Sequence, residues 1–401
     1  MRAAKQPLPG TPIVDYDPYT EGAILEAHRC DGALRDEAPV AFLRRYGIWA
    51  VSGHEECKAV LADHETFSSA GRPFDEKPGE GARPGILVTQ DPPEHTRARA
   101  VLHRTLSPRR LRQMRDMFEA EAGRQLDALL AHGSVEVDGH EDLAQPFVLT
   151  VFPDLLGLPQ EGRDHLRMFG DAVFNATGPH NEIFAEKMQS ASKAIAWVDQ
   201  ACLRESQTPG SLGEEVYAAV DAGEIDDAEA FLLVKAMFAA GFDTTIASLG
   251  SMILAFAEHP DQWEALQADE GLARNAFEEV LRYYSPSRSG GRVATADAVV
   301  GEVEIPAEAR VLVLWLAAGR DPRHWERAES FDIRRRATGH LNLGYGIHAC
   351  VGQALARVEG AAMLSSLLQR VQALELTGPP RVAVNMNAQL HDRIPVRLHP
   401  R

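Results

Sequence analysis

A single cysteine in a glycine-rich segment is the first feature of this chain that could do chemistry. Cys350 stands in GYGIHACVGQALARVEG, between Gly346 and Gly352 and just before a helix-forming run. The free N–H groups of a helix N-terminus stabilise a thiolate, and glycine allows the backbone to approach a flat ligand closely. The alternative is a buried, inert thiol, which is what most free cysteines are. The pattern Gly-x-His-x-Cys-x-Gly, with His348 as its histidine, sets this cysteine apart.

A second unusual segment, AAGFDTT at residues 239–245, interrupts an apolar helical run over 226–258. Gly241 costs about 1 kcal/mol relative to alanine inside a helix, and Asp243 and Thr244 are poor helix formers as well. Three such residues together indicate either a local opening of the helix or a second helix that Asp243 caps.

Two charged pairs lie at helical spacing. Glu279 and Arg282 in FEEVLRYYSP are three residues apart, and His95 and Arg99 in QDPPEHTRARAVL are four apart on a helix that follows two prolines. Each pair shares one helix face, and such pairs usually contribute only a few tenths of a kcal/mol at a surface.

In this order, the four motifs resemble those of the cytochromes P450, and the resemblance spans nearly the whole chain. It implies haem b (iron protoporphyrin IX) as the cofactor, with Cys350 as the thiolate ligand of the iron. A thiolate ligand favours cleavage of the O–O bond and hence oxygen insertion. Gly346 and Gly352 would shape the haem loop. The chain departs from the family at Leu343, where the usual phenylalanine would shield the sulfur.

The resemblance also assigns the charged residues. Two buried haem carboxylates need cationic or hydrogen-bonding partners, and the matching positions are His95, Arg99, Arg292 and His348. Arg97 is the next candidate if the register differs by a turn. Glu279 and Arg282, completed by Arg335, would form a structural ion pair that holds the haem loop and takes no part in the chemistry.

Asp243 and Thr244 match the oxygen-activating signature of the family. Thr244 would hydrogen-bond dioxygen and Asp243 would relay protons from solvent, which is general acid catalysis. The resemblance therefore implies a monooxygenase that takes electrons from NAD(P)H through a separate [2Fe–2S] ferredoxin and its reductase. The basic segment SPRRLRQMR, with Arg109, Arg110 and Arg112, would suit an acidic ferredoxin; a solvated helix face is the alternative.

Segments such as FPDLLGLPQEGRDHL and VFNATGPHNE are most similar to bacterial members that O-demethylate or hydroxylate para-substituted benzoic acids. The resemblance implies a pocket that keeps one aromatic ring, loses two others, and has alanines where relatives have polar residues. The implied pocket residues are Phe174, Thr177, Gly291, Ala236, Ala239, Ala240 and the displaced carboxylate anchor Arg72. We therefore expect a methoxylated or larger para-substituted aromatic substrate, with Phe174 stacking on the ring.

Other readings remain open at this point. The substrate could be a terpenoid or polyketide biosynthetic intermediate. The protein could be a haem-thiolate sensor without turnover, although a sensor has no need of the Asp243–Thr244 pair. A zinc or disulfide role for Cys350 would give a colourless protein.

The elements that must position these residues follow from periodicity. Helices are expected over 92–130, 160–175, 181–204, 226–258, 260–283 and 352–371. Strands are expected within 40–53, 134–139, 299–316 and 394–400. This is a mainly α fold with small β-sheets and a long central helix over the haem, in one catalytic domain of residues 1–401.

Composition excludes several other functions. A net charge of −17 argues against a nucleic-acid partner. The four cysteines are scattered, which suits a reducing compartment better than a disulfide or zinc scaffold. The chain opens without an apolar leader, and the longest uncharged apolar stretch, 244–257, is too short to cross a bilayer. We expect a cytoplasmic monomer with no membrane contact.

Overall fold

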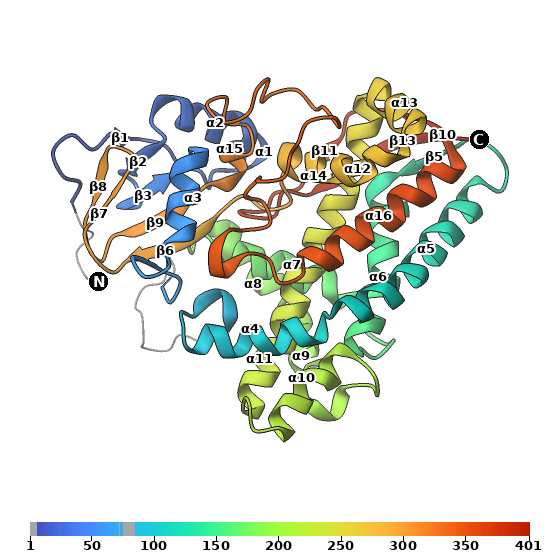
Figure 1. Cartoon of the computed structure of the whole chain (residues 1–401), viewed down its shortest axis with the longest axis horizontal. Helices are drawn as coiled ribbons and strands as arrows, with labels where there is room; N and C mark the ends of the chain where they lie inside the picture. Colours follow the sequence, from blue (N-terminus) through green and yellow to red (C-terminus); the bar gives the residue numbers. More distant parts are fainter. Residues whose placement is uncertain (1–5, 72, 75–84) are drawn as a thin grey trace.

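Helices make up most of the molecule in the computed structural model, which describes residues 6–71, 73–74 and 85–401 (Figure 1). The α-helices are α1 (Glu21–Leu25), α2 (Ala27–Glu37), α3 (His54–Ala62), α4 (Glu94–Thr105), α5 (Pro108–Leu130), α6 (Gln145–Leu156), α7 (His165–Asn175), α8 (Glu182–Ser190), α9 (Ser192–Ala201), α10 (Leu212–Asp221), α11 (Asp227–Gly241), α12 (Asp243–Glu258), α13 (Pro260–Ala268), α14 (Ala273–Tyr284), α15 (Trp315–Ala318) and α16 (Gln353–Arg370).

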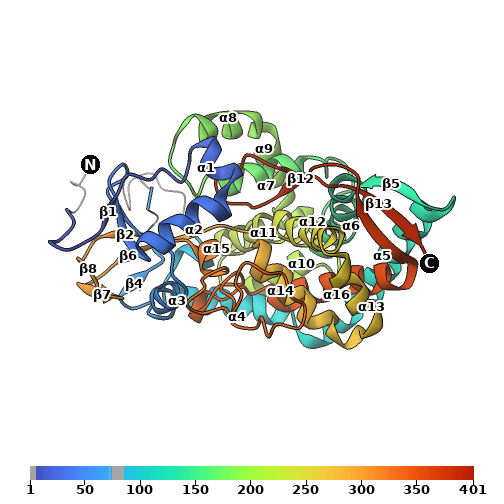
Figure 2. The ribbon, with the colours of Figure 1, turned by 90° about the horizontal axis from the view of Figure 1, so that it is seen from above.

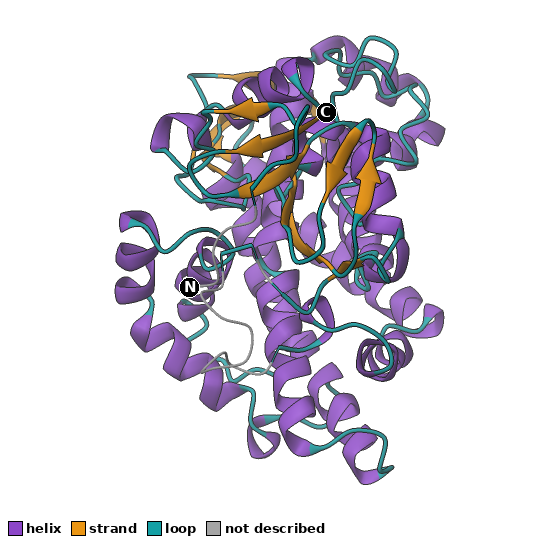
Figure 3. Cartoon of the chain, turned by 90° about the vertical axis from the view of Figure 1, so that its left-hand side faces the viewer, coloured by secondary structure: helices purple, strands orange, loops and turns teal. Residues whose placement is uncertain are grey.

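The strands form small sheets set against this helical body (Figure 3). The six-stranded sheet has the order β1 (Ile13–Val14), β2 (Val40–Leu43), β3 (Ile48–Val51), β9 (Arg310–Val313), β6 (Gly290–Ala294) and β4 (Phe67–Ser68). A three-stranded sheet has the order β10 (Val371–Leu376), β13 (Pro395–Pro400) and β5 (Val135–Asp138). Two pairs complete the set, β7 (Ala298–Val300) with β8 (Val303–Ile305) and β11 (Arg381–Val382) with β12 (His391–Arg393). The predicted mainly α fold with small sheets is confirmed.

The predicted central helix over 226–258 is two helices, α11 and α12, that meet at Phe242. Asp226 caps α11 in a capping box with Glu229, and Pro260 begins the next helix directly after α12. A Cβ at Gly241 would collide with the ring of Phe152 from α6, so the close approach of α6 requires glycine there. Of the two readings of AAGFDTT, the opening is the one observed, since Asp243 starts α12 without capping it by a side-chain hydrogen bond.

This pair of helices runs through the middle of the molecule (Figure 2). Within the described ranges, 227–258 is the one helical stretch long and apolar enough to cross a membrane. Every side chain of α12 from Thr245 to Ala257 is buried by the surrounding protein. The apolar side chains of α12 therefore pack in the hydrophobic core of the protein.

Several predicted helices are interrupted for local reasons. The helix predicted over 92–130 breaks between α4 and α5, because Pro108 pushes Ser107 out of the helical region. The regions 181–204 and 260–283 likewise each hold two helices. The strand region predicted over 299–316 ends at Val313, since Trp315 begins α15. Helix α6 was not predicted, and it contains Pro146 in its first turn and Pro153 inside.

Candidate active site

The cysteine turn has the shape that its glycines allow. Gly344 and Gly346 have φ values of +70° and +66°, a region that favours glycine. A Cβ at Gly346 would lie 2.6 Å from the carbonyl oxygen of Leu61 in α3, so only glycine permits this approach. The N–H of Cys350 donates to the carbonyl of Leu343 at 2.6 Å. The turn thus holds the cysteine three residues before α16, near its predicted start.

The side chain of Cys350 is accessible although it lies deep in the molecule. Burial raises the pKa of its thiol, while the N–H of Gly352, which bonds the sulfur, and the charges of Arg99 and Arg357 act in the opposite direction. All four cysteines are free. Among the described residues Cys350 does not belong to a His, Cys or carboxylate cluster that could hold a metal ion. Its sulfur therefore faces an interior space, with positive groups nearby.

Basic side chains from separate elements converge beside this turn. The rings of His95 (α4) and His348 have centroids 4.4 Å apart. Burial, together with the charge of Arg292 from β6, lowers the pKa of His348 to about 3. Burial also lowers the pKa of Arg292 to about 10. Arg99 donates to the carbonyl of Ala349 at 2.6 Å, which fixes it next to the cysteine.

This basic cluster lacks the anions that it needs. The Nε2 atoms of His95 and His348 are buried and make no hydrogen bond within the described part of the chain. Arg292 is buried, and among the described residues its guanidinium donates only to the carbonyl of Gly291, at 2.7 Å. The nearby acid Asp91 already accepts hydrogen bonds from Ser68 and Ser69. A buried arginine without an anionic partner and buried imidazole nitrogens without a hydrogen bond are both costly, so the cluster fits a ligand that brings carboxylates, as haem b does.

Arg97, the alternative to Arg99, lies on the surface and forms an ion pair with Glu229. Its guanidinium is thus directed away from the basic cluster. The register of α4 that brings His95 and Arg99 to the cysteine turn is the one observed.

The carboxyl of Asp243 is enclosed at the start of α12. Its side chain is 5% exposed, and a Cβ at Gly170 of α7 would collide with the carboxylate. Burial raises the pKa of Asp243 well above its usual range, and the negative charge of Asp171 adds to the effect, while Arg167 opposes it. Burial thus favours the protonated form of Asp243. It is a proton donor next to an opened helix.

The hydroxyl of Thr244 forms a hydrogen bond across the junction between α11 and α12. Its Oγ1 donates to the carbonyl of Ala240 at 2.6 Å, and Ser248 donates to the carbonyl of Thr244 at 2.7 Å. Ala240 is exposed although it lies in the middle of the central helix pair. The structure thus places a buried carboxyl and a hydroxyl at adjacent positions of the chain, where α11 ends and α12 begins.

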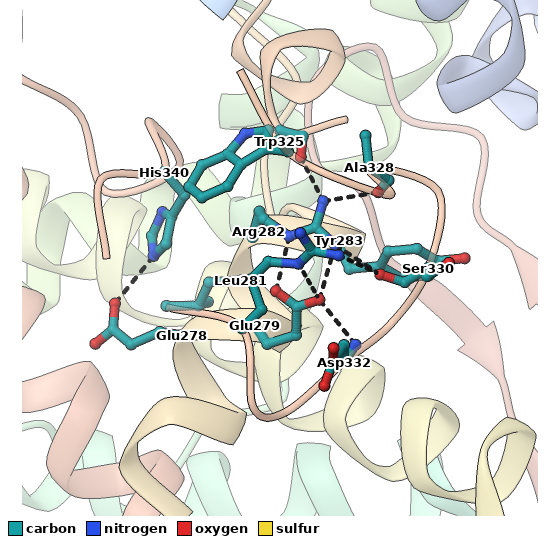
Figure 4. Close-up of polar contacts among 12 residues, drawn as sticks. Glu278, Glu279, Leu281, Arg282, Tyr283, Trp325, Ala328, Ser330, Asp332 and His340 are labelled. Carbon is teal, nitrogen blue, oxygen red and sulfur yellow. Dashed lines mark hydrogen bonds and ion pairs between the residues drawn. The ribbon is translucent and has the colours of Figure 1, made fainter. Parts of the chain in front are cut away.

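Glu279 and Arg282 form a fully buried pair, not a surface decoration (Figure 4). The guanidinium of Arg282 contacts both carboxylate oxygens at 2.7 and 2.8 Å. Its remaining N–H groups donate to the carbonyls of Gly319, Ala328 and Ser330 at 2.7 to 3.0 Å. Arg335 joins the carboxylate at 3.1 Å. Each charge is satisfied, as a buried pair requires.

The adjacent Glu278 links α14 to His340, which precedes the cysteine turn, and to α16. It contacts Nε2 of His340 at 3.1 Å, and Arg357 of α16 contacts the same carboxylate. Burial alone would raise the pKa of Glu278, but the hydrogen bonds from these two partners lower it to about 2. Sequence spacing did not predict this network, because its members are far apart in the chain.

A cavity of about 220 Å³ adjoins the cysteine turn. Of the predicted pocket residues, Thr177 and Gly291 line it, together with Arg292 and His348. Phe174 contributes its carbonyl, which accepts the Thr177 hydroxyl at 2.7 Å, and its ring does not line this cavity. Three other predicted pocket residues lie in α11 and not in the wall of this cavity: Ala236, Ala239 and Ala240. Arg72 lies outside the described residues.

The cavity wall also includes polar residues that sequence reasoning missed. The hydroxyls of Ser69 and Thr89 are buried and have no hydrogen-bond partner in the described chain. The amide of Asn387 donates to Thr177 Oγ1 at 3.1 Å. These residues lie outside regular helices or in a single short turn, so no periodicity marks them.

Glu359 in α16 is another residue that sequence reasoning missed. It is buried against α12, where Thr245 Oγ1 lies 3.4 Å from its Oε2, and its Oε1 has no partner in the described part of the protein. Burial raises its pKa from 4.5 to about 8. The sequence signal that could have identified it was a glutamate on the apolar face of a predicted helix, because a buried carboxyl is costly without a partner.

Glu359→Gln is expected to make stability less dependent on pH. Because the folded pKa exceeds the unfolded one, the stabilisation is fully present below about pH 4.5 and is lost as the pH rises to about 8. The loss is about 1.4 kcal/mol per pH unit in that window. Urea unfolding at about pH 5.5 and about pH 7.5 measures it. The exposed Glu119→Gln is the control, and equal slopes for wild type and E359Q would contradict the prediction.

Three comparisons relate the chain to known proteins. The family model described as Cytochrome P450 matches residues 140–390. The chain is 37% identical over 394 residues to cytochrome P450 CYP199A2 of Rhodopseudomonas palustris, covering 98% of this chain and 95% of the relative. It is 32% identical to the erythromycin C-12 hydroxylase of Saccharopolyspora erythraea, covering 84% and 85%.

Solved structures share the same arrangement. Cytochrome P450 CREJ in complex with (4-ethylphenyl) dihydrogen phosphate has a TM-score of 0.84 at 27% identity, with 96% of this chain and 99% of that chain covered. A mutant of P450 EryK in complex with erythromycin B has a TM-score of 0.80 at 30% identity, with 94% and 96% covered.

Proposed function

The chain belongs to the cytochrome P450 family, and we propose that it is a ferredoxin-dependent monooxygenase that O-demethylates or hydroxylates a small para-substituted or methoxylated aromatic compound. Family membership makes it a haem-containing P450 monooxygenase. The proposal includes the substrate class and electron supply from NAD(P)H through a reductase and a [2Fe–2S] ferredoxin. It also includes a single domain over residues 1–401 and a cytoplasmic, monomeric state.

Cys350 is proposed as the iron ligand, in the turn shaped by Gly346 and Gly352. When bound, haem b supplies the oxygen chemistry, which a thiolate ligand promotes. The carboxylates of the haem would be held by the basic cluster defined above: His95, Arg99, Arg292 and His348. Its unpartnered buried nitrogens support this assignment. Glu279 and Arg282, completed by Arg335, are proposed to hold the 319–335 segment in place.

Asp243 and Thr244 are proposed to deliver protons. Asp243 holds its proton at the carboxyl because burial and the charge of Asp171 disfavour ionisation. The carboxylate of Asp171 pairs with Lys187 at 2.8 Å, and both are partly exposed. Asp171 therefore offers a contact between the enclosed acid and solvent. The Thr244 hydroxyl, which now donates to the carbonyl of Ala240, would donate a hydrogen bond to dioxygen, and Asp243 would supply the protons.

Polar side chains in the cavity wall and one solved relative support the choice of a substituted aromatic ring as substrate. The unpartnered hydroxyls of Ser69 and Thr89 suit oxygen substituents on such a ring. CREJ, which was solved with a para-substituted phenyl phosphate, supports the same class.

Macrolide or polyketide hydroxylation is the second candidate. It is favoured by the similarity to the erythromycin C-12 hydroxylase and to EryK in complex with erythromycin B.

Titration of the ferric holoenzyme distinguishes the two. We expect methoxybenzoates, guaiacols or cinnamates to displace water from the iron and to shift the Soret band toward the high-spin form, with erythromycin B giving no shift. Products with ferredoxin and reductase should then be demethylated or hydroxylated rings. A shift with erythromycin B and with none of the aromatic compounds would overturn the aromatic assignment in favour of the second candidate.

Arg109 and Arg112 on α5 are expected to guide the ferredoxin. Both are exposed, whereas Arg110 pairs with Glu215 and is neutralised. Arg109→Glu with Arg112→Glu should slow ferredoxin-supported turnover about 10-fold at low salt, because complementary charge raises association rates. Stopped-flow reduction against ferredoxin concentration measures this effect.

The matched control is Arg124→Glu, on the same helix and already paired with Glu121. Its rate should stay close to that of the wild type. Unchanged reduction rates for the double variant at low salt would show that the ferredoxin docks elsewhere.

A further inference from the structure

Three metal-ligating groups meet at the start of α3, away from the cysteine turn. His54 is the first residue of α3, Glu55 follows it, and His324 comes from the turn after α15. The Nδ1 atoms of both histidines lie 3.0 Å from the same oxygen, Glu55 Oε1. The two rings stack with centroids 3.4 Å apart and planes 14° apart. Two imidazoles and a carboxylate thus share one small space.

The hydrogen bonds of His54 leave its Nδ1 atom available to a metal ion. Nε2 of His54 lies 3.2 Å from the carbonyl of Gly339, and a carbonyl only accepts, so Nε2 carries the ring proton. In the neutral ring Nδ1 is then a bare lone pair, although it faces a carboxylate oxygen that also only accepts. The His54 side chain is buried, so water cannot relieve the contact.

The two imidazole rings are in face-to-face contact at 3.4 Å, and both Nδ1 atoms approach the same carboxylate oxygen. The nearby acid Asp321 is already bonded to Arg323 and to the His54 backbone N–H. One divalent cation would satisfy all three lone pairs at once.

From this geometry we infer that His54, Glu55 and His324 form a binding site for zinc or a similar divalent transition metal. Imidazole nitrogen and carboxylate oxygen are ordinary zinc ligands, with bonds of about 2.0–2.2 Å. The Gly339 carbonyl on the far nitrogen of His54 is the kind of outer contact that orients a ligating histidine. Glu55 and His324 have exposed side-chain fractions of 65% and 31%, so both can turn toward the ion. Water would complete the coordination.

The bound metal would stabilise the wall behind the cysteine turn. It would join the start of α3 to the 321–325 turn and, through His54, to Gly339. The other end of α3 supports the turn, where Leu61 abuts Gly346. We therefore expect metal binding to raise the thermal stability of the holoenzyme without entering the chemistry at Cys350.

The test uses the intact holoenzyme, treated with EDTA, equilibrated with zinc and freed of excess metal by gel filtration. Elemental analysis gives zinc relative to haem iron. We expect one zinc per iron for the wild type, and a melting temperature that rises with zinc as mass action requires. His324→Ala and Glu55→Gln should each retain little zinc, and both change exposed residues, so the fold should survive; an unchanged haem spectrum verifies this.

His399→Ala is the matched control, because His399 forms an exposed pair with Glu375 at 3.2 Å and belongs to no cluster of three ligands. It should retain zinc like the wild type. The inference is overturned if the wild type retains no more zinc than His324→Ala, or if the melting temperature of both responds equally to zinc. Neither outcome would bear on the proposed oxidation, which is measured separately.

Discussion

Replacement of Cys350 by histidine is expected to abolish turnover and to remove the long-wavelength Soret band of the reduced, carbon monoxide-treated holoenzyme. That band requires a thiolate on the iron, because the sulfur supplies the electron density that an imidazole does not. The Cys350 side chain opens to an interior space, and the N–H of Gly352 bonds its sulfur. The measurement is the difference spectrum, with haem content determined on the same sample.

Cys30→Ser provides the control for this experiment. Cys30 is also free and partly exposed, but it lies in α2 and outside the turn. Its variant should give the wild-type band and rate. A haem-loaded Cys350→His protein that still shows the thiolate band would mean that another residue binds the iron, and the proposed site would be wrong.

Asp243→Asn is expected to lower kcat about 100-fold while substrate still binds, because a positioned general acid contributes roughly 10²–10⁴-fold. The amide keeps the size of the side chain but cannot release a proton. Burial raises the pKa of the wild-type carboxyl well above its usual range. Wild-type turnover should therefore be full while the carboxyl is protonated and should fall as the pH rises through that raised pKa. The variant should lack this fall.

The measurements are kcat against pH, the solvent deuterium isotope effect and the ferric spin-state titration. We expect a larger isotope effect in Asp243→Asn and an unchanged titration. Ser248→Ala is the control, since Ser248 lies on the same helix and its hydroxyl only bonds the carbonyl of Thr244. A variant with wild-type kcat, or one that keeps the wild-type pH profile, would exclude Asp243 from proton delivery.

Capping residues, prolines and glycines in the sequence predicted the features of the fold that depend on neighbouring residues in the chain, such as helix ends and breaks. Asp226 and Pro260 bound the central helix pair as the capping pattern indicates. The three unfavourable residues around Gly241 correctly marked a break, although the reason for the glycine, the ring of Phe152, lies on another helix. Local patterns failed at α6, where prolines conceal a helix that packing stabilises.

The site was less predictable wherever distant segments meet. The motif positions of His95, Arg292 and His348 were readable, yet only the fold brings them together with unpartnered nitrogens. Ala239 and its neighbours fit the pattern of a pocket wall, but the observed cavity is lined by loop residues such as Ser69. Glu278 illustrates the same point, since its partners His340 and Arg357 are more than sixty residues away.

The buried arginine of α14 has a further consequence for how the enzyme could be engineered. Three main-chain oxygens of the 319–330 segment are bound to Arg282, and lysine could not replace it because an ammonium group lacks the planar fork of donors. This segment should therefore dock as one cooperative unit or not at all. Segment exchange with relatives that aims to broaden the substrate range is best confined to the cavity loops, leaving 319–335 intact as an inherited block.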